Sequence, residues 1–296
     1  MSSIKKFWNK NTCGFFVKDK NIGDVQYFNM LSQKRYETYW EILKFAPFKH
    51  TYKKKVLEIG LGVGNDADEF VKNKADYYGV DLTSSSVNFV RERLKKKYNY
   101  NTNKIITCDS KKTPFKNNFF EVIYSFGVIH HSQNTEEIIQ EIKRILKPGG
   151  KIFIMIYNRS SVFYLIEILI FRRLIILLDC FPFFRTFIKY FLNNSRKIQI
   201  FNYLNRVKKR YSNRSFLTNQ ELLNSSSDHA DCPLAKVYNK NEALSLFSEF
   251  KSIKTYTIYN EKTDSIFWKL FSPILDIFSR PLRENFGWFR IIEGKK

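Results

Sequence analysis

The chain has 296 residues, of which 44% are hydrophobic and 17% aromatic, enough to bury a large core as one enlarged domain or as a domain with a cap. Its formal net charge of +22 can indicate nucleic acid or an anionic membrane surface as a partner. Because Lys, Asn, Ile, Phe and Tyr are all abundant and the basic residues are spread over the whole chain, we favour an AT-rich base composition as the cause.

The N-terminal residues 1–8 lack the apolar segment of a signal peptide, which favours a cytoplasmic protein. The four cysteines are far apart and form neither a CxxC pair nor a Cys/His cluster, so we expect no disulfide framework and no metal site. They are Cys13, Cys108, Cys180 and Cys232.

The run VLEIGLGVGN (56–65) predicts a buried strand that ends in a glycine-rich turn and opens a helix. Glycine adopts φ > 0 and lets a ligand approach the backbone closely. Gly60, Gly62 and Gly64 form the pattern GxGxG, with Asn65 where the third glycine of a dinucleotide fingerprint would stand. The pattern argues against a pyrophosphate cradle and favours a compact adenosyl ligand over the strand end.

Three further apolar runs, 77–82, 104–110 and 120–131, each end in polar side chains. Asp81 follows the glycine turn by about twenty residues, where nucleotide-binding folds place a carboxylate on the ribose hydroxyls. Asp109 ends the next run and suits the exocyclic amine of adenine. Since strands alternate with helical stretches, we expect a parallel, doubly wound sheet that gathers these endings at one edge.

A helix stop and turn follow at LKPGG (146–150), and then a strand at 151–157. The motifs VLEIGLGVG, GVDLT, CDSKKTPF, FFEVIYSFGVIHH and RILKPGG together resemble class I S-adenosylmethionine-dependent methyltransferases, in the type 11-like group that includes small-molecule methylases. The resemblance covers roughly 56–158. It implies a Rossmann-like, mostly parallel seven-stranded sheet with an antiparallel last strand and helical cap insertions. Glu121 stands where the family often has Asp, and we expect no consequence.

The resemblance implies S-adenosyl-L-methionine as the cofactor. Glu58 and the glycine turn would hold its methionine part, Asp81 the ribose and Asp109 the adenine, with Ser125 beneath the sulfonium. The residues expected to bind the cofactor are Glu58, Gly60, Gly62, Gly64, Asp81, Leu82, Asp109, Ser110 and Ser125.

Two adjacent histidines follow the fourth strand. An imidazole can take a proton from a hydroxyl or an acidic carbon, so we expect a general base among them, with His131 preferred over His130. The alternative is that both begin the next helix and position the loop. If one of them is a general base, replacing both should lower turnover and leave cofactor affinity intact. If their role is structural, cofactor binding should be lost as well.

The middle of the chain is unusually apolar at 161–184, but Glu167, Arg172, Arg173 and Asp179 interrupt it, so we do not expect it to span a membrane. We favour a helical cap that packs on the sheet and on itself and can line the acceptor pocket. The alternative is an apolar lid that shapes the pocket or rests on a membrane surface. A basic, exposed helix and a linker are expected at 193–214.

The polar segment 228–238 resembles segments that close over the acceptor in related enzymes. We expect Asp228, His229 and Tyr238 to line the acceptor pocket, with an ordinary capped loop as an equal alternative. A helix at 241–250 and two final strands at 253–259 and 288–292 complete the expected elements, with a helix-like insertion at 265–278 between the strands.

The chain therefore divides into an N-terminal helical leader (1–55), a cofactor-binding core (56–158), a cap with the acceptor site (159–250) and C-terminal strands that complete the sheet (251–296). The resemblance implies that the leader folds over the cofactor mouth. Tyr27 or Tyr36 would stack near the sulfonium there, or else pack as part of an aromatic helix.

The expected function is transfer of a methyl group to an O or C atom of a small, hydrophobic acceptor, in the cytoplasm or at the membrane periphery. Ser125-Phe126-Gly127-Val128 stands where amino-group methylases of DNA or protein carry Asn-Pro-Pro-Tyr, which argues against those acceptors. The alternatives are an RNA methyltransferase, favoured only by charge, and a non-catalytic adenosyl-binding partner subunit. The acceptor's identity and the oligomeric state stay open.

Overall fold

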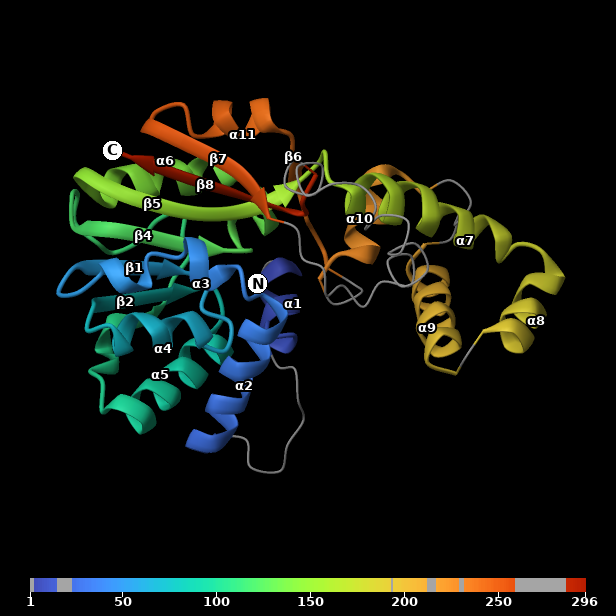
Figure 1. Ribbon diagram of the computed structural model, residues 1–296, viewed down its shortest axis with the longest axis horizontal. Helices are drawn as coiled ribbons and strands as arrows, with labels where there is room; N and C mark the ends of the chain where they lie inside the picture. The colour runs from blue at the N-terminus through green and yellow to red at the C-terminus, as the bar shows by residue number, and fades with distance from the viewer. Residues whose placement is uncertain (1–2, 15–22, 193, 212–216, 229–231, 259–285) are drawn as a thin grey trace.

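The computed structural model describes residues 3–14, 23–192, 194–211, 217–228, 232–258 and 286–296. Within them a single mixed sheet has the strand order β3-β2-β1-β4-β5-β8-β7, and the short β6 pairs with the end of β5 (Figure 1). The strands are β1 (Lys55–Ile59), β2 (Asp76–Asp81), β3 (Ile105–Thr107), β4 (Phe120–Phe126), β5 (Leu146–Asn158), β6 (Val237–Tyr238), β7 (Lys251–Ile258) and β8 (Phe289–Lys295).

The pairing directions confirm the predicted architecture. Strands β1 to β5 are mutually parallel, whereas β8 runs antiparallel to both β5 and β7. Parallel neighbours place their carboxyl ends at one edge, so the polar endings of β1, β2 and β4 meet there. The expected insertion at 265–278 lies outside the described residues.

Helices cover both faces of the sheet, and this is why its strands are apolar on both sides. Side chains of α4 (Asn65–Lys72) and α5 (Ser84–Tyr98) join one core cluster with Val56 and Tyr124, together with α3 (Ile42–Phe45). Side chains of α6 (Thr135–Ile145) and α11 (Lys240–Leu246) join another with Leu57. Val56 and Leu57 thus point to opposite faces, as the pleat requires.

Strand β5 starts earlier than predicted. The expected turn at 146–150 belongs to the strand, since Leu146 pairs with Phe120 and a register shift accommodates the irregularity. Gly149 has φ of 74°, and its N–H donates to the carbonyl of Lys296 at 3.0 Å. The helix before this segment ends as predicted, at Ile145, but the proline and glycines lie within an irregular part of β5 and not in a separate turn.

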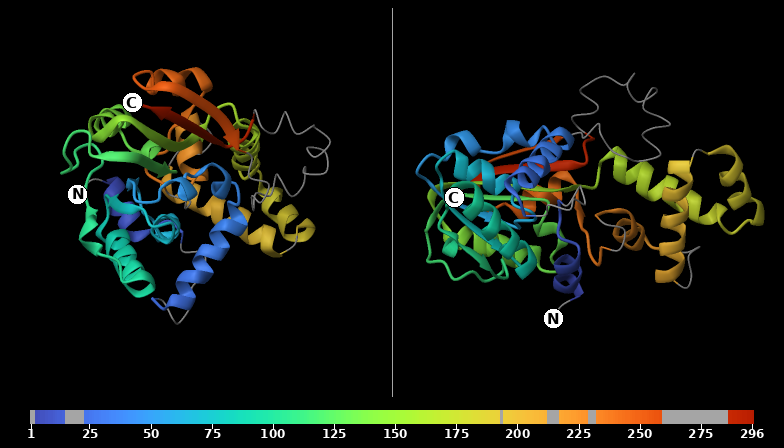
Figure 2. Two further views of the ribbon diagram at one scale, coloured as in Figure 1. Left: turned by 60° about the vertical axis from the view of Figure 1, so that its left-hand side comes forward. Right: turned by 90° about the horizontal axis from the view of Figure 1, so that it is seen from below.

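Helices from the middle of the chain form an arm that projects from the end of β5, as Figure 1 and both views of Figure 2 show. We define the arm as the π-helical segment η4 (Phe163–Arg172) with α7 (Arg173–Leu178), α8 (Pro182–Phe191), α9 (Asn194–Arg210) and α10 (Asn219–Ser226). The predicted helices are present, and among the described residues the arm packs on the sheet at its root. Its buried side chains otherwise pack on each other, among them Ile175, Ile176, Ile188, Ile200, Tyr203, Leu204, Val207 and Leu223.

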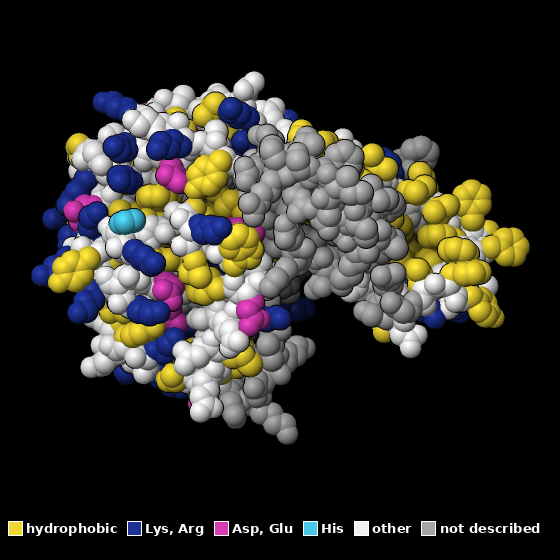
Figure 3. Space-filling model, in the orientation of Figure 1, with side chains coloured by type: hydrophobic (Ala, Val, Ile, Leu, Met, Phe, Trp, Pro, Cys, Tyr) yellow, Lys and Arg dark blue, Asp and Glu magenta, His cyan; other side chains and the backbone are white. Residues whose placement is uncertain are grey.

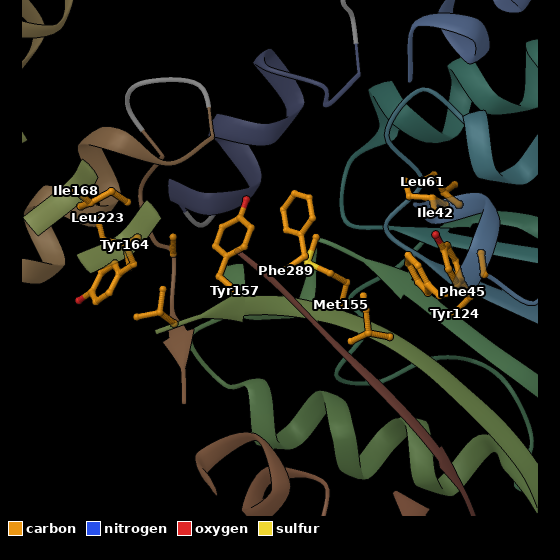
Figure 4. Close-up of a cluster of buried hydrophobic side chains, with 14 of the residues drawn as sticks. Ile42, Phe45, Leu61, Tyr124, Met155, Tyr157, Tyr164, Ile168, Leu223 and Phe289 are labelled. Carbon is orange, nitrogen blue, oxygen red and sulfur yellow. The ribbon is translucent and has the colours of Figure 1, made fainter. Parts of the chain in front are cut away.

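One hydrophobic cluster connects the sheet to the root of the arm. Figure 4 shows it running from Tyr124, beside α3, through Tyr157 of β5 to Ile168 of η4. The first turn of η4 is also tied to the C-terminal segment, because the N–H of Val162 donates to the carbonyl of Phe286 at 3.1 Å. Among the described residues, the arm thus shares a hydrophobic core with the sheet at its root.

Candidate functional site

A cavity of about 300 Å³ opens at the carboxyl ends of β1, β2 and β4. Seven of the nine predicted cofactor residues line it: Glu58, Gly60, Gly62, Asp81, Leu82, Asp109 and Ser110. Gly64 and Ser125 do not. The hydroxyl of Ser125 is fully buried and donates to the carbonyl of Ile59 at 3.0 Å, so it joins β4 to β1 beneath the cavity.

Protein neighbours explain the glycines of the turn as directly as a ligand would. Gly60 has φ of 83°, and a side chain there would overlap Val128. Gly62 has φ of 51°, and an added Cβ would lie 2.8 Å from the carbonyl oxygen of Cys13. Gly64 begins α4 with φ of 75°. Glycine is therefore needed here both for its positive φ and for the close approach of other segments.

Asp81 ties the ends of two strands together. Its Oδ2 accepts the N–H of Leu61 at 2.8 Å, and its Oδ1 accepts the N–H and the hydroxyl of Thr83 at 2.9 and 2.7 Å. These donors fix the carboxylate at the cavity wall. Burial raises the pKa of Asp81, and the hydrogen bonds from Thr83 and Leu61 oppose that shift.

Glu58 lies at the floor of the cavity, where its carboxylate accepts the hydroxyl of Tyr77 at 2.6 Å. Burial raises the pKa of Glu58 well above its ordinary value, and the nearby Asp66 raises it further. A buried carboxylate of this kind favours the binding of a cationic group, since a bound ammonium group would stabilise its charged form.

Arg35 is a cavity residue that sequence reasoning missed. It lies on α2 (Val25–Thr38), and its Nε and Nη2 donate to the two carboxylate oxygens of Asp66 at 3.1 and 2.7 Å. The guanidinium carbon also stands 5.1 Å from the ring centroid of Phe126. Nη1 has no hydrogen-bond partner among the described residues. No local motif marks Arg35, because the contact joins segments 31 positions apart.

The tyrosines considered in the leader do not line the cavity. Tyr27 is buried against Phe28 and Leu31, and the hydroxyl of Tyr36 donates to the carboxylate of Asp66 at 3.0 Å. Their positions agree with the alternative of an aromatic helix packed on the core.

The N-terminal segment closes one side of the cavity. Trp8 of α1 (Ser3–Lys10) and Cys13 line it. The N–H of Ser85 donates to Asn9 at 3.3 Å, and the hydroxyls of Ser85 and Thr12 are 3.2 Å apart. Two polar contacts to α5 thus hold this segment over the cavity.

His131 lies at the cavity wall with both ring nitrogens engaged. Nδ1 is 2.7 Å from the carbonyl oxygen of Leu234, and because a carbonyl can only accept, this nitrogen carries a proton. Nε2 is 3.2 Å from the carboxylate of Asp228, which also accepts the hydroxyl of Tyr157. Burial by itself lowers the pKa of His131, but Asp228 and Cys232 outweigh it and raise the pKa to about 10.

The pKa of Asp228 is shifted in the opposite direction from that of His131. Burial would raise the pKa of this carboxyl, whereas the hydrogen bonds and charge of His131 and Tyr157 lower it to about 2. His131 and Asp228 therefore form a buried ion pair at neutral pH. A protonated imidazole is a donor, so this geometry does not present His131 as the free base expected from the sequence.

His130 differs from its neighbour. It is fully buried beneath His131 and Tyr157, with ring centroids 4.3 and 4.0 Å away, and does not line the cavity. Neither ring nitrogen has a hydrogen-bond partner among the described residues. Burial, assisted by the charge of His131, lowers the pKa of His130 well below its ordinary value, so the ring is neutral.

The two expected acceptor residues that the structure describes, Asp228 and Tyr238, do not lie together. Asp228 contacts His131 at the cavity wall, whereas His229 lies outside the described residues. The hydroxyl of Tyr238 donates to Thr135 at 3.1 Å, and its side chain lines a separate hollow beside α6 and α11. Tyr238 is therefore placed away from the cavity.

No cluster of three or more His, Cys, Asp or Glu side chains suited to a metal ion occurs among the residues that the structure describes. Within the same residues, no helix combines the length and the apolar character needed to cross a bilayer.

The sequence and fold were compared with known proteins. A family model described as a methyltransferase domain matches residues 57–154. Phosphoethanolamine N-methyltransferase 2 of Caenorhabditis elegans is 32% identical over 137 residues, which cover 45% of this chain and 30% of that protein. A sterol 24-C-methyltransferase of Gibberella zeae is 34% identical over 97 residues, which cover 32% of this chain and 26% of that protein.

A solved structure is similar in fold to this chain. Phosphoethanolamine N-methyltransferase 2 of Haemonchus contortus, in complex with phosphomonomethylethanolamine and S-adenosylhomocysteine, aligns with a TM-score of 0.52 at 14% identity. The alignment covers all of this chain and 61% of that one. The matched segments span under a third of the length of the two curated relatives, and the family model covers residues 57–154, which precede the arm.

Proposed function

Since residues 57–154 are a methyltransferase domain, we propose that this protein is an enzyme that transfers a methyl group from S-adenosyl-L-methionine to a small acceptor. The observation that carries the proposal is the anchored carboxylate of Asp81 beside the glycine turn, at the edge of the sheet where such folds bind nucleosides.

The residues of the cavity suit the chemical groups of this cofactor. Asp81 would accept the two ribose hydroxyls, and Asp109 with Ser110 would contact the adenine. Glu58 would accept a hydrogen bond from the amino group of the methionine part. Arg35 would donate a hydrogen bond from its unengaged Nη1 to the carboxylate of the same methionine part. Each pairing satisfies a charge or a hydrogen-bonding group at the cavity wall.

The cofactor supplies a methyl group that is already activated on a sulfonium, so the main task of the protein is to hold the acceptor atom about 3–3.5 Å away and in line. Trp8, Phe126 and Val128 give the cavity apolar walls beside His131. These walls support a hydrophobic acceptor, and methylation on its oxygen or carbon is part of the proposal. The curated relatives are named for both N- and C-methylation, so the acceptor atom is the finer part of the proposal.

We assign His131 the role of a charged donor in preference to that of a general base. Its Nε2 is buried 3.2 Å from the carboxylate of Asp228, so an acceptor oxygen would share this N–H with Asp228. A donated hydrogen bond from a cation lowers the pKa of a bound hydroxyl and stabilises its anionic, nucleophilic form.

Calorimetric titration with S-adenosylmethionine and S-adenosylhomocysteine tests the cofactor assignment. Asp81→Asn should weaken binding by at least about tenfold, because the ribose loses a charged acceptor. Asp76→Asn is the matched control, since Asp76 lies at the opposite end of the same strand and pairs with Lys55 and Lys104. Its affinity should stay within about twofold of the parent.

Transfer itself is tested by incubating the protein and methyl-labelled cofactor with lipid, quinone-like and RNA fractions. Label in a small hydrophobic product supports the proposal, whereas label in RNA overturns the acceptor class. If the folded protein binds neither form of the cofactor, the enzymatic proposal is wrong. Tight binding without transfer to any fraction would instead favour a non-catalytic partner subunit.

A further inference from the structure

The arm exposes apolar side chains on an outward face. Along η4 and α7, Ile170, Leu174 and Leu177 lie four and three residues apart, which puts them on one side of the helix. Phe181 follows at the turn into α8, and its side chain is 63% exposed. The opposite side of the same helix carries Ile175 and Ile176, which are buried, so the outward face is a second apolar face.

Helix α8 repeats this arrangement. Phe183, Phe187, Tyr190 and Phe191 follow the helical spacing of one face, and the first, third and fourth are 83%, 81% and 73% exposed. Ile188, on the other side, is buried in the arm. In Figure 3 hydrophobic side chains gather at the far end of the arm, where α7 and α8 lie in Figure 1.

An exposed aromatic and aliphatic surface of this kind is unusual for a protein that contacts only water, and it marks an interaction site. We define the tip surface as Ile170, Leu174, Leu177, Phe181, Phe183, Phe187, Tyr190 and Phe191. It does not form a wall of the cavity, since none of its residues lines it. The tip surface therefore needs a partner other than the cofactor or an acceptor already bound.

The charge of the arm identifies that partner. Residues 163–210 contain ten Lys or Arg and two acidic residues, for a net charge of +8. Both acidic residues of 163–210 are paired within this stretch, Glu167 with Arg172 and Asp179 with Arg185, each at 2.7 Å, and α10 adds one further acidic residue, Glu221, to the arm. The basic residues thus outnumber their acidic partners, and several of them are exposed, for example Lys189, which lies between the aromatic residues of α8.

We propose that the tip surface docks the protein on an anionic lipid bilayer, with the aromatic side chains of α8 in the interfacial region and the basic residues of the arm on lipid headgroups. Phenylalanine and tyrosine on one helix face, with lysine beside them, are the side chains that interfacial helices use. Anionic headgroups complement the +8 charge. This proposal rests on the arm alone and does not depend on the methyltransferase function.

Docking through the tip would place the bilayer at the free end of the arm, and none of the tip residues lines the cavity at the carboxyl ends of β1, β2 and β4. A bound bilayer would then raise the local concentration of membrane-dissolved compounds near the enzyme without closing its cofactor site. The tip surface and the cavity should accordingly respond to separate substitutions.

Flotation of the full chain with vesicles of phosphatidylcholine alone, or mixed with phosphatidylglycerol, tests the proposal. The parent protein should float with the mixed vesicles and be released by salt. Substitution of Phe183, Phe187 and Phe191 by Ser should lower the partition coefficient by at least about tenfold. Trp40, Leu43 and Tyr52 are exposed outside the arm, in the leader, and their triple Ser variant is the matched control.

A variant with altered charge provides a second test of the proposal if the aromatic variant folds poorly. Lys189→Gln with Lys197→Gln should weaken binding to the mixed vesicles by about fivefold per lysine, whereas Lys49→Gln with Lys151→Gln should have no such effect. Circular dichroism and thermal midpoints establish that each variant is folded.

Two results would overturn the proposal. One is a parent protein that does not bind mixed vesicles, or that binds equally well after the tip substitutions. The other is a dimer, measured by light scattering, that the tip substitutions convert to a monomer without any vesicle binding by the parent. The tip surface would in that case be an interface between copies of the chain.

Discussion

At the scale of residues, the site is defined by carboxylates in different electrostatic states. Asp81 is held by backbone and side-chain donors, Glu58 is buried with a raised pKa, and Asp228 is ionised beside a cationic His131. Each state follows from the number of donors that reach the carboxylate and from its burial. The three groups should therefore respond differently to ligand and to pH.

Binding of the cofactor should release a proton from Glu58. An ammonium group placed beside this carboxyl lowers its raised pKa, so the protonated fraction falls on binding. Calorimetry in buffers of different ionisation enthalpy measures the proton count directly. The release should disappear in Glu58→Gln, and an unchanged count in that variant would show that another group titrates.

The His131–Asp228 pair should stabilise the protein over a defined pH range. The pKa of His131 is raised to about 10, so its contribution is complete below its ordinary value of 6.5 and is lost as pH rises through about 10. The pKa of Asp228 is lowered to about 2, so its contribution is complete above 3.8 and is lost toward pH 2. The contribution is thus largest between these ordinary values.

Chemical denaturation of Asp228→Asn across that pH range should show a loss of about 3 kcal/mol in the free energy of unfolding, because a buried imidazolium is left without its counter-ion.

In His131→Gln we expect turnover to fall by about tenfold to a hundredfold while cofactor affinity changes little. A parent pH–rate profile with a limb near pH 6.5 that this variant removes would restore the role of a general base.

At the scale of elements, one buried cation joins three helices. Arg93 of α5 is fully buried, and its Nη1 donates to the carbonyl of Val63 at 2.8 Å. Its Nη2 reaches Asp68 of α4 at 2.6 Å and the carbonyl of Phe28 in α2 at 3.1 Å. The glycine turn is positioned through these contacts, since Val63 belongs to it.

Arg93→Met should therefore destabilise the fold by about 3 kcal/mol, as expected when one partner of a buried pair is removed. Asp68 keeps a second cation, because Lys97 lies 2.6 Å from the same oxygen. Lys95→Met, at an exposed position of the same helix, is the control and should change stability by less than about 0.5 kcal/mol. Equal midpoints in urea for the two variants would contradict the assignment.

At the scale of the whole molecule, the cavity and the tip surface are built by different parts of the chain. Strand ends and the N-terminal segment form the cavity, whereas the arm carries the tip surface. The N-terminal segment should act on the cavity without supporting the core, because α1 has no buried residue and the carbonyl of Cys13 lies over Gly62.

Removal of residues 1–14 should thus raise the dissociation constant of S-adenosylhomocysteine by at least about tenfold. The thermal midpoint of the protein without ligand should change little. Calorimetry and a thermal scan of the truncated and full chains measure both quantities. An unchanged dissociation constant would show that the N-terminal segment lies beside the cavity without contributing to ligand binding.

The sequence by itself determined the sheet and the order of its motifs. Strand ends such as Asp81 and the turn at Gly60 are local patterns, because apolar runs, glycine and the following acid lie within a few residues of each other. A parallel sheet then brings those ends to one edge whatever the loops between them do. That is why seven of the nine predicted cofactor residues line one cavity.

Only the tertiary structure decided contacts between distant segments. Arg35 meets Asp66, and His131 meets Asp228 and becomes a cation, although no spacing in the sequence links these residues. Apolar periodicity at 161–184 likewise predicts helices but not which of their faces finds a partner, and α8 leaves Phe183 and Tyr190 exposed. Periodicity records the hydrophobicity of a face, whereas burial depends on what the rest of the chain places against it.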